Sequence, residues 1–151
     1  MSFAKKVIVA IGLTNSVASS EGMKTLVDMS FLEKCEIHFV HVFQTINYSA
    51  VFGEFTAVYP MEANRSEIEQ SVLTSLVGLT KDVLPPNFSG RVIHRCLFAQ
   101  TPKVEFCHYV THTGADLVII PTRAKRGFFE SSFAQYVNKH TSINMILLKS
   151  K

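Results

Sequence analysis

The sequence predicts one α/β domain: a doubly wound, five-stranded and mainly parallel sheet with helices on both faces. Short apolar runs rich in β-branched residues, such as Val7–Ile11, are typical of strands buried on both faces of a parallel sheet. Segments with helical spacing of apolar residues alternate with these runs along the chain. The 151 residues, 47% hydrophobic and 18% charged, contain no internal repeat and no boundary, so residues 1–151 are expected to form a single domain.

The composition argues against several classes of protein. The net charge is only +3 and no long run of like charges occurs, so nucleic acid is not expected as a partner. Three cysteines without a C-x-x-C spacing indicate neither a disulfide scaffold nor a four-cysteine zinc site, and they favour a reducing, cytoplasmic compartment. No apolar stretch is long enough to span a bilayer, and Met1–Ile11 lacks the pattern of a signal peptide. We therefore expect no membrane contact and no secretion.

The first half of the chain predicts two strands and one helix. Val7–Ile11 is the first strand, and turn and capping residues follow it at Gly12–Ser16. Cys35–Phe43 alternates at its start and ends in an apolar run, which predicts the second strand. The segment Gln44–Pro60 has no period but is rich in aromatic residues, so we expect a long loop that is ordered by packing or by a partner. The helix between the two strands is predicted by apolar residues at Val17, Met23, Leu26, Val27 and Phe31.

The middle of the chain predicts two helices around a third strand. Met61–Val83 carries an apolar stripe typical of a long amphipathic helix, which Pro85 and the residues after it end. Arg91–Phe98 is the third strand. Thr101–Pro102 then has the pattern of a helix N-cap followed by proline at the first helical position, and Gly114 ends that helix.

The last third predicts two more strands. Asp116–Ile120 is the fourth strand, and a polar, basic loop is expected at Pro121–Gly127. A helix around Ser131–His140 follows, and Ile143–Lys149 is the fifth strand. We expect this final strand to lie at an edge of the sheet, where an exposed apolar strand must be covered. An antiparallel pairing of Met145–Lys149 with its copy in a second chain would cover it and give a twofold homodimer.

Over essentially its whole length, the chain resembles the universal stress protein family. The resemblance rests on four segments in this order and at these spacings: Lys6–Ile11, Phe39–Val42, Thr101–Pro102 and Gly114–Ile120. It implies a flavodoxin-like domain, related to the adenine-nucleotide alpha-hydrolase fold, that is usually a homodimer with a role in cytoplasmic stress physiology.

The resemblance is weakest where nucleotide-binding members hold ATP. In those members the first strand ends in an aspartate that contacts adenine, and the matching residue here is Gly12. Their phosphate loop contains Gly, two residues, Gly, nine residues, then Gly and Ser or Thr. Here Pro121 and Ala124 stand at the first two glycine positions. Counting nine further residues reaches Ala134–Gln135, whereas a shorter loop aligns Ser131–Ser132 with the end of the motif, so no glycine is kept either way.

The loss of these glycines has a physical consequence for phosphate binding. Glycines let backbone N–H groups approach phosphates without a Cβ in the way, and Pro121 has no N–H to donate. The chain is therefore similar to the universal stress protein A type, which lacks the ATP motif, and no cofactor is expected. Polar and basic residues remain that could still bind an anion, with Ser131 as a possible helix cap: Thr122, Arg123, Lys125 and Arg126.

Two functions follow as hypotheses. The first is a cytoplasmic homodimeric stress-response protein that acts through contacts with other proteins and is not an enzyme, since no catalytic arrangement can be argued from the sequence. The alternative is a sensor of ATP, AMP or another small ligand in the crevice at the carboxyl ends of the strands. A weaker third interpretation is a regulatory partner of a kinase, transporter or transcription factor that orders Gln44–Pro60. The crevice of the sensor would be lined by Gly12, Thr14, Val42, Arg123, Arg126, Ser131 and Ser132.

Two histidines, His108 and His112, have a spacing on a helix that can hold a divalent metal. The segment lacks the glutamate of the H-E-x-x-H motif and no third ligand is evident, so a solvated helix face is favoured and no metal site is predicted. His41 is expected to pack or to form a hydrogen bond and not to act as a base.

Cysteines and basic residues have ordinary interpretations as well. Cys96 and Cys107 are expected to be buried and unreactive. Cys35, at the start of a strand, is expected to be more exposed and is the best candidate for a redox sensor. Arg123–Arg126, followed by Phe128 and Phe129, mixes cations with aromatics as single-strand nucleic-acid binders do. Four positions are too few for a binding groove, so solvated loop charge is favoured.

Overall fold

A computed structural model of the chain describes residues 5–12, 22–47, 58–59, 62–123 and 127–150. Five strands form one sheet in the order β5-β2-β1-β6-β7, and each neighbouring pair is parallel. This confirms the predicted doubly wound α/β fold. The strands are β1 (Lys6–Ala10), β2 (Glu36–Gln44), β5 (Arg91–Ala99), β6 (Leu117–Arg123) and β7 (Asn144–Ser150).

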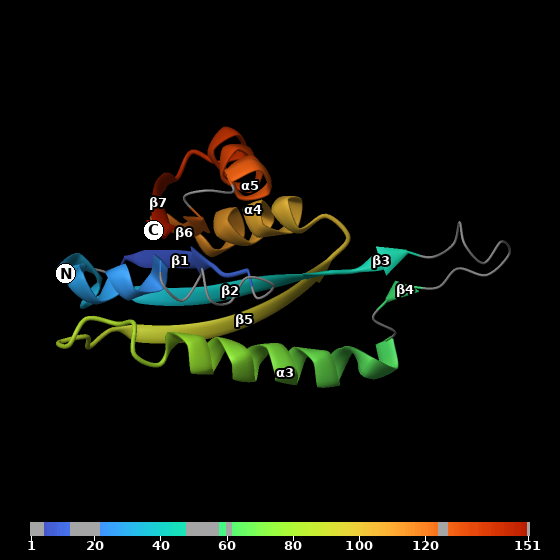
Figure 1. The fold of residues 1–151 in the computed structure, drawn as a ribbon, viewed down its shortest axis with the longest axis horizontal. Coiled ribbons are helices and arrows are strands. Elements are labelled where there is room, and N and C mark those ends of the chain that lie inside the picture. Colours follow the sequence, from blue (N-terminus) through green and yellow to red (C-terminus); the bar gives the residue numbers. More distant parts are fainter. Residues whose placement is uncertain (1–4, 13–21, 48–57, 60–61, 124–126, 151) are drawn as a thin grey trace, which may run out of the picture.

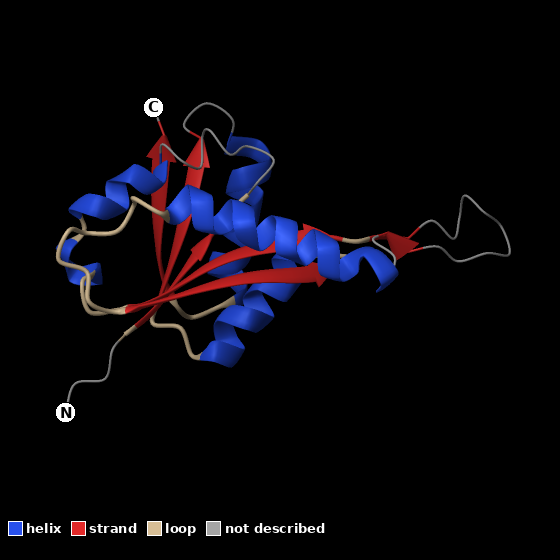
Figure 2. Cartoon of the chain, turned by 90° about the horizontal axis from the view of Figure 1, so that it is seen from below, coloured by secondary structure: helices blue, strands red, loops and turns tan. Residues whose placement is uncertain are grey.

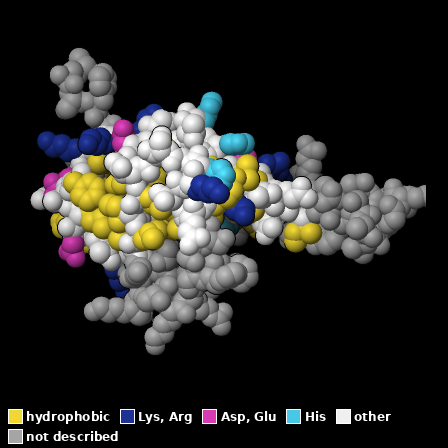
Figure 3. Space-filling model, turned by 90° about the horizontal axis from the view of Figure 1, so that it is seen from above, with side chains coloured by type: hydrophobic (Ala, Val, Ile, Leu, Met, Phe, Trp, Pro, Cys, Tyr) yellow, Lys and Arg dark blue, Asp and Glu magenta, His cyan; other side chains and the backbone are white. Residues whose placement is uncertain are grey.

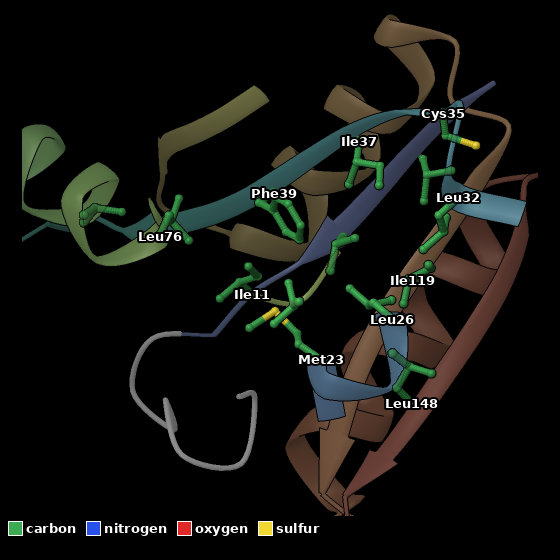
Figure 4. Close-up of a cluster of buried hydrophobic side chains, with 14 residues drawn as sticks. Ile11, Met23, Leu26, Leu32, Cys35, Ile37, Phe39, Leu76, Ile119 and Leu148 are labelled. Atoms are coloured by element: carbon green, nitrogen blue, oxygen red, sulfur yellow. The ribbon is translucent and has the colours of Figure 1, made fainter. Parts of the chain in front are cut away.

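Helices cover both faces of the sheet, as the sequence predicts. α3 (Glu62–Thr80) lies on one face, and α4 (Pro102–Thr113) and α5 (Gly127–His140) lie on the other (Figure 1). The core is accordingly divided into two clusters of buried side chains. Figure 4 shows the cluster on the α3 face, where Met23 and Leu26 lie close to Ile119 and Leu148. The other cluster is centred on Ile8, Val40, Phe106 and Val110.

α4 has the boundaries that its sequence signals predict. Thr101 has an extended backbone at the N-cap and Pro102 is the first helical residue, although the Thr101 side chain makes no capping hydrogen bond. At the other end Gly114 has φ 70° and ψ 43°, a left-handed conformation that glycine adopts without strain. These two signals fix the length of the helix, and with it the position of His108 and His112.

The helix predicted after β1 is partly wrong. Its described part contains two short 3-10 helices, η2 (Lys24–Asp28) and η3 (Ser30–Leu32), whereas Val17 lies outside the described residues. β-branched residues at positions 25 and 27 and serine at position 30 disfavour a continuous α-helix. Two tight turns still bury Leu26 and Leu32 completely against the sheet.

The prediction of a loop at Pro121–Gly127 is also partly wrong, because β6 continues as a strand to Arg123. Pro121, Thr122 and Arg123 pair with Leu148, Lys149 and Ser150 of β7. On its other side β6 pairs with β1 only as far as Ile119 opposite Val9. Beyond that point β6 pairs, among the described residues, with β7 alone, and this is the kind of position where a strand tolerates proline. The last helix also begins earlier than predicted, at Gly127 and not near Ser131.

The segment predicted as a long loop contains a two-stranded ribbon. β3 (Ile46–Asn47) pairs antiparallel with β4 (Val58–Tyr59), with Ile46 opposite Tyr59. The ribbon extends past the helices at the carboxyl end of β2 (Figures 1 and 2). Antiparallel pairing therefore orders both ends of the segment, while residues 48–57 lie outside the described residues. Among the helices that the structure describes, none is long and apolar enough to cross a membrane.

Candidate functional site

The crevice predicted for a small ligand would lie at the carboxyl ends of β1 and β6. The strand order reverses between these two neighbours, which is the point where open α/β sheets usually bind ligands. Gly12 lies two residues after the end of β1 and is exposed, and Val42 is half-buried on β2, two positions beyond the residue that pairs with Ala10. The structure therefore places two of the predicted crevice residues near this reversal.

The remaining crevice residues are only partly described. Thr14 and Arg126 lie outside the described residues. Arg123 is the last residue of β6, opposite Ser150, and Ser131 and Ser132 lie inside α5. Ser131 is thus not the cap of that helix, because the residues from Gly127 to Glu130 contain no proline or β-branched side chain and extend the helix toward the N-terminus.

The carboxyl end of β6 is closely packed. A β-carbon placed on the buried Gly22 would lie 3.3 Å from Cβ of Pro121 and 3.6 Å from the carbonyl oxygen of Leu148. The chain at residue 22 therefore lies directly against the residue that replaces the first glycine of the phosphate loop. Pro121 removes a backbone donor at this point, and the packing of Gly22 occupies space beside it.

His41 has the hydrogen-bonding role that the sequence favours. Its Nδ1–H donates to the carbonyl oxygen of Ile11 at 2.8 Å. Desolvation in this half-buried position lowers the pKa of the imidazole, so the neutral ring is favoured. His41 thus ties β2 to the chain directly after β1, at the rim of the crevice.

Cysteine thiols provide no reactive site among the described residues. Cys35 is only 6% exposed and its Sγ–H donates to the carbonyl oxygen of Phe31 at 3.3 Å, so its predicted role as an exposed redox sensor is wrong. Burial raises the pKa of Cys35 and of Cys107, and it raises that of Cys96 to about 11. The prediction that Cys96 and Cys107 are unreactive is consistent with thiols that stay protonated at neutral pH.

A second concave region lies on α4 beside α5. This groove has a volume of about 620 Å³, and the sequence alone did not indicate it. Tyr136 of α5 stacks on His140 with ring centroids 3.9 Å apart, and Nζ of Lys103 lies 5.0 Å from the centre of the Tyr136 ring. Figure 3 shows histidine side chains gathered on the face seen from above. The residues that line the groove are Val104, Glu105, Cys107, His108, Tyr109, Thr111, His112, Tyr136 and His140.

Below this groove, a polar network joins α4 to the sheet. Tyr109 donates its hydroxyl proton to Nδ1 of the buried His38 at 2.6 Å, and Nε2–H of His38 donates to a carboxylate oxygen of Glu36 at 2.9 Å. The hydrogen bond from His38 lowers the pKa of Glu36. Desolvation raises the pKa of Tyr109. Sequence reasoning missed this network, although polar residues at positions 36 and 38 of an otherwise apolar strand are a signal for it.

The arrangement offers no metal cage as it stands. Within residues 5–12, 22–47, 58–59, 62–123 and 127–150, no group of three His, Cys, Asp or Glu side chains is arranged to hold a metal ion. The buried polar side chains of the same residues all have hydrogen-bond partners.

Comparison with known proteins identifies relatives over nearly the whole chain. A model of the Universal stress protein family matches residues 4–149. A search of curated proteins finds no match.

Several solved structures share the fold at low sequence identity. A universal stress protein from Archaeoglobus fulgidus is 12% identical, with a TM-score of 0.62, and the match covers 97% of this chain and 100% of that one. The structure of the Archaeoglobus fulgidus protein in complex with dAMP is 13% identical, with a TM-score of 0.61 and coverage of 99% and 100%. A family protein from Arabidopsis thaliana with AMP bound is 15% identical, with a TM-score of 0.56 and coverage of 97% and 92%.

Proposed function

Because the chain belongs to the universal stress protein family, we propose that it is a homodimeric stress-response protein that acts in the cytoplasm through contacts with other proteins. In this proposal the chain performs no catalysis and lacks the standard contacts of the family with ATP. Its partners would be proteins, and neither nucleic acid nor a membrane surface would be among them.

The observation that carries the proposal is the packing at the end of β6. Pro121 continues the strand and pairs with Leu148, where a phosphate loop would need a flexible glycine with a free N–H. Gly22 lies against the same residue, so the space beside it is already filled by the chain. Gly12 also provides no carboxylate for adenine. Two contacts that nucleotide-binding members make, through a carboxylate and a backbone donor, are therefore lost in this chain.

Whether the protein binds an adenine nucleotide can be tested on the purified protein. Mass spectrometry of the small molecules released on denaturation, followed by equilibrium dialysis of labelled ATP, ADP and AMP against the stripped protein, is expected to find no stoichiometric nucleotide. Bound adenine nucleotide at one per chain would instead show that the altered loop works, and would favour the sensor.

The edge strand β7 supports the homodimer. β7 ends the sheet on one side, and Leu147 is 44% exposed although it lies in an apolar strand. An uncovered edge strand of this kind invites pairing with another strand, and antiparallel pairing with its own copy gives a closed twofold interface. Leu148 is buried in the core of its own chain, so a variant at Leu147 tests the interface without a large effect on the fold.

Light scattering coupled to size-exclusion chromatography measures the molar mass of the protein in solution, and with it the oligomeric state. The wild type is expected at twice the 16.9 kDa of one chain, and Leu147→Lys at the mass of one chain, because like charges would meet at the interface. Val77→Lys is the matched control, since Val77 is 51% exposed on α3, away from β7. A wild-type monomer, or a Leu147→Lys dimer of unchanged affinity, would contradict the proposed interface.

A nucleotide sensor is the second candidate, and a specific observation favours it. Structures in complex with dAMP and with AMP match this chain over nearly its full length. The basic residues at the end of β6 could then contact phosphates by side-chain charge in place of backbone donors. Under this alternative, Arg123→Ala would weaken nucleotide binding at least tenfold, whereas the first proposal expects no binding to lose.

A further inference from the structure

The groove on α4 contains two histidines that differ from all the others in the chain. The chain has six histidines. His38 is bonded to Tyr109 and Glu36, His41 to the Ile11 carbonyl, and His140 to the Tyr136 carbonyl. Nε2–H of His94 donates to Oγ1 of Thr80, 2.8 Å away, because the Thr80 proton is already donated to Leu76.

The two exceptions are His108 and His112. Both are exposed, and neither forms a hydrogen bond, an ion pair or a ring contact with any residue in the described part of the chain. They are one helical turn apart on the same face of α4, so their side chains are neighbours. The fold therefore uses four imidazoles for structure and leaves these two side by side at the surface of a groove.

Two adjacent imidazoles suit one kind of ligand better than others. A histidine pair separated by one helical turn can hold a divalent transition-metal ion through one ring nitrogen of each residue. Imidazole nitrogen is a good ligand for Zn²⁺, Ni²⁺ and Cu²⁺, whereas Mg²⁺ and Ca²⁺ prefer oxygen. The other positions around the ion would face the groove, where water or a further ligand can enter.

Neighbouring groups explain why the site would have two protein ligands. Cys107 is only 7% exposed and packs in the core cluster under α4, so its thiol is not available at the surface beside His108 and His112. His140 is held by its stacking on Tyr136 and by the bond from its Nδ1–H to the Tyr136 carbonyl at 2.9 Å. Within the described residues, no third His, Cys, Asp or Glu side chain is placed to join His108 and His112 around one metal ion.

We propose that His108 and His112 form a binding site for a divalent transition-metal ion on α4, separate from the crevice at the ends of β1 and β6. Zinc is a natural occupant, and the site would hold it with water completing the coordination. The site is independent of whether the chain binds a nucleotide.

Isothermal titration with Ni²⁺ at about pH 7.5 tests the site in the purified full chain. The wild type is expected to bind a single ion per chain, and both His108→Ala and His112→Ala to weaken binding by about tenfold or more, because a chelate loses one of its two ligands. Zn²⁺ should displace the bound Ni²⁺.

His140→Ala is the matched control, because it removes an imidazole from the same groove that the proposal does not use as a ligand. Its affinity for Ni²⁺ is expected to stay within about twofold of the wild type. An equal loss in His140→Ala, or wild-type affinity in the double variant of His108 and His112, would overturn the proposal. Circular dichroism of each variant ensures that the comparison is between folded proteins.

Discussion

The hydroxyl oxygen of Tyr109 and Nδ1 of His38 lie 2.6 Å apart, and this contact joins α4 to a central region of the sheet. Glu36 accepts from the other ring nitrogen, which fixes the tautomer of His38 and makes Tyr109 the donor. The hydrogen bonds of Tyr109, His38 and Glu36 therefore depend on one another. His38 is only 6% exposed, so the network is a point where a single lost partner leaves a buried polar group unsatisfied.

Tyr109→Phe is expected to lower the free energy of unfolding by about 1–2 kcal/mol, because it leaves Nδ1 of His38 without a donor at a buried position. Urea unfolding followed by circular dichroism measures the change. Tyr136→Phe keeps the ring that stacks on His140 and is expected to stay within about 0.5 kcal/mol of the wild type. Equal effects of the two variants would show that the hydrogen bond to His38 contributes nothing.

The pH dependence of stability should reflect His41 and His94, whose pKa values are both lowered by desolvation. The unfolded chain then binds protons more readily than the folded chain below the ordinary histidine pKa of about 6.5, so stability falls as the pH drops from 7 toward 5. His94→Gln removes one of these groups and should make the fall shallower over that window. Chemical unfolding at several pH values measures both slopes, and identical slopes would contradict the role of His94.

Gly90 and Gly78 should respond in opposite directions to the same substitution. A β-carbon at residue 90 would overlap the carbonyl oxygen of Cys35, which accepts the backbone N–H of Arg91 at 3.2 Å, so Gly90→Ala must displace the start of β5. A β-carbon on Gly78 of α3 would meet nothing within 4 Å, and alanine is favoured over glycine in a helix by about 1 kcal/mol. Thermal unfolding should show a lower Tm for Gly90→Ala and a higher Tm for Gly78→Ala. A Gly90→Ala protein as stable as the wild type would be inconsistent with this packing.

Leu76 and Val77 are adjacent on α3 but have opposite environments. Leu76 is fully buried against the sheet and Val77 is 51% exposed. Leu76→Ala is expected to cost about 2–5 kcal/mol through lost burial and the cavity that remains. Val77→Ala should change the free energy of unfolding by no more than about 0.5 kcal/mol. Denaturant unfolding of the pair tests whether α3 presents this face to the sheet, and a larger loss at Val77 would reverse that assignment.

The sheet could be predicted from the sequence because each central strand is a short apolar run that can be identified from its own residues. Val7–Ile11 and Leu117–Ile120 are apolar on both faces, which is typical of strands at the centre of a parallel sheet. Thr101–Pro102 and Gly114 likewise fix the ends of α4 by backbone constraints that act within a few residues. At α4 the sequence-based boundaries and the structure agree.

Features that depend on contacts between distant segments could not be predicted. The exposure expected for Cys35 was wrong because η3 and the chain near Gly90 cover it. The continuation of β6 past Pro121 depends on the length of β7, which offers it a partner. The groove on α4 could be predicted only if the end of α5, with Tyr136 and His140, were known to lie beside that helix. The pattern of apolar residues within one segment does not indicate which distant segment packs against it.

The unequal lengths of the strands have a mechanical consequence. β2 and β5 pair over nine positions, from Glu36 opposite Arg91 to Gln44 opposite Ala99, whereas β1 ends at Ala10 opposite Val40. The last part of this pair and the β3–β4 ribbon beyond it extend as a lever whose inner end is anchored in the middle of the sheet (Figure 2). Thr45 alone separates β3 from β2, and β2 leads back to His41, whose imidazole donates to the Ile11 carbonyl just beyond β1. The exchange rate of the Ile11 amide, which donates to Val40, would therefore report events at the ribbon from the far end of that lever.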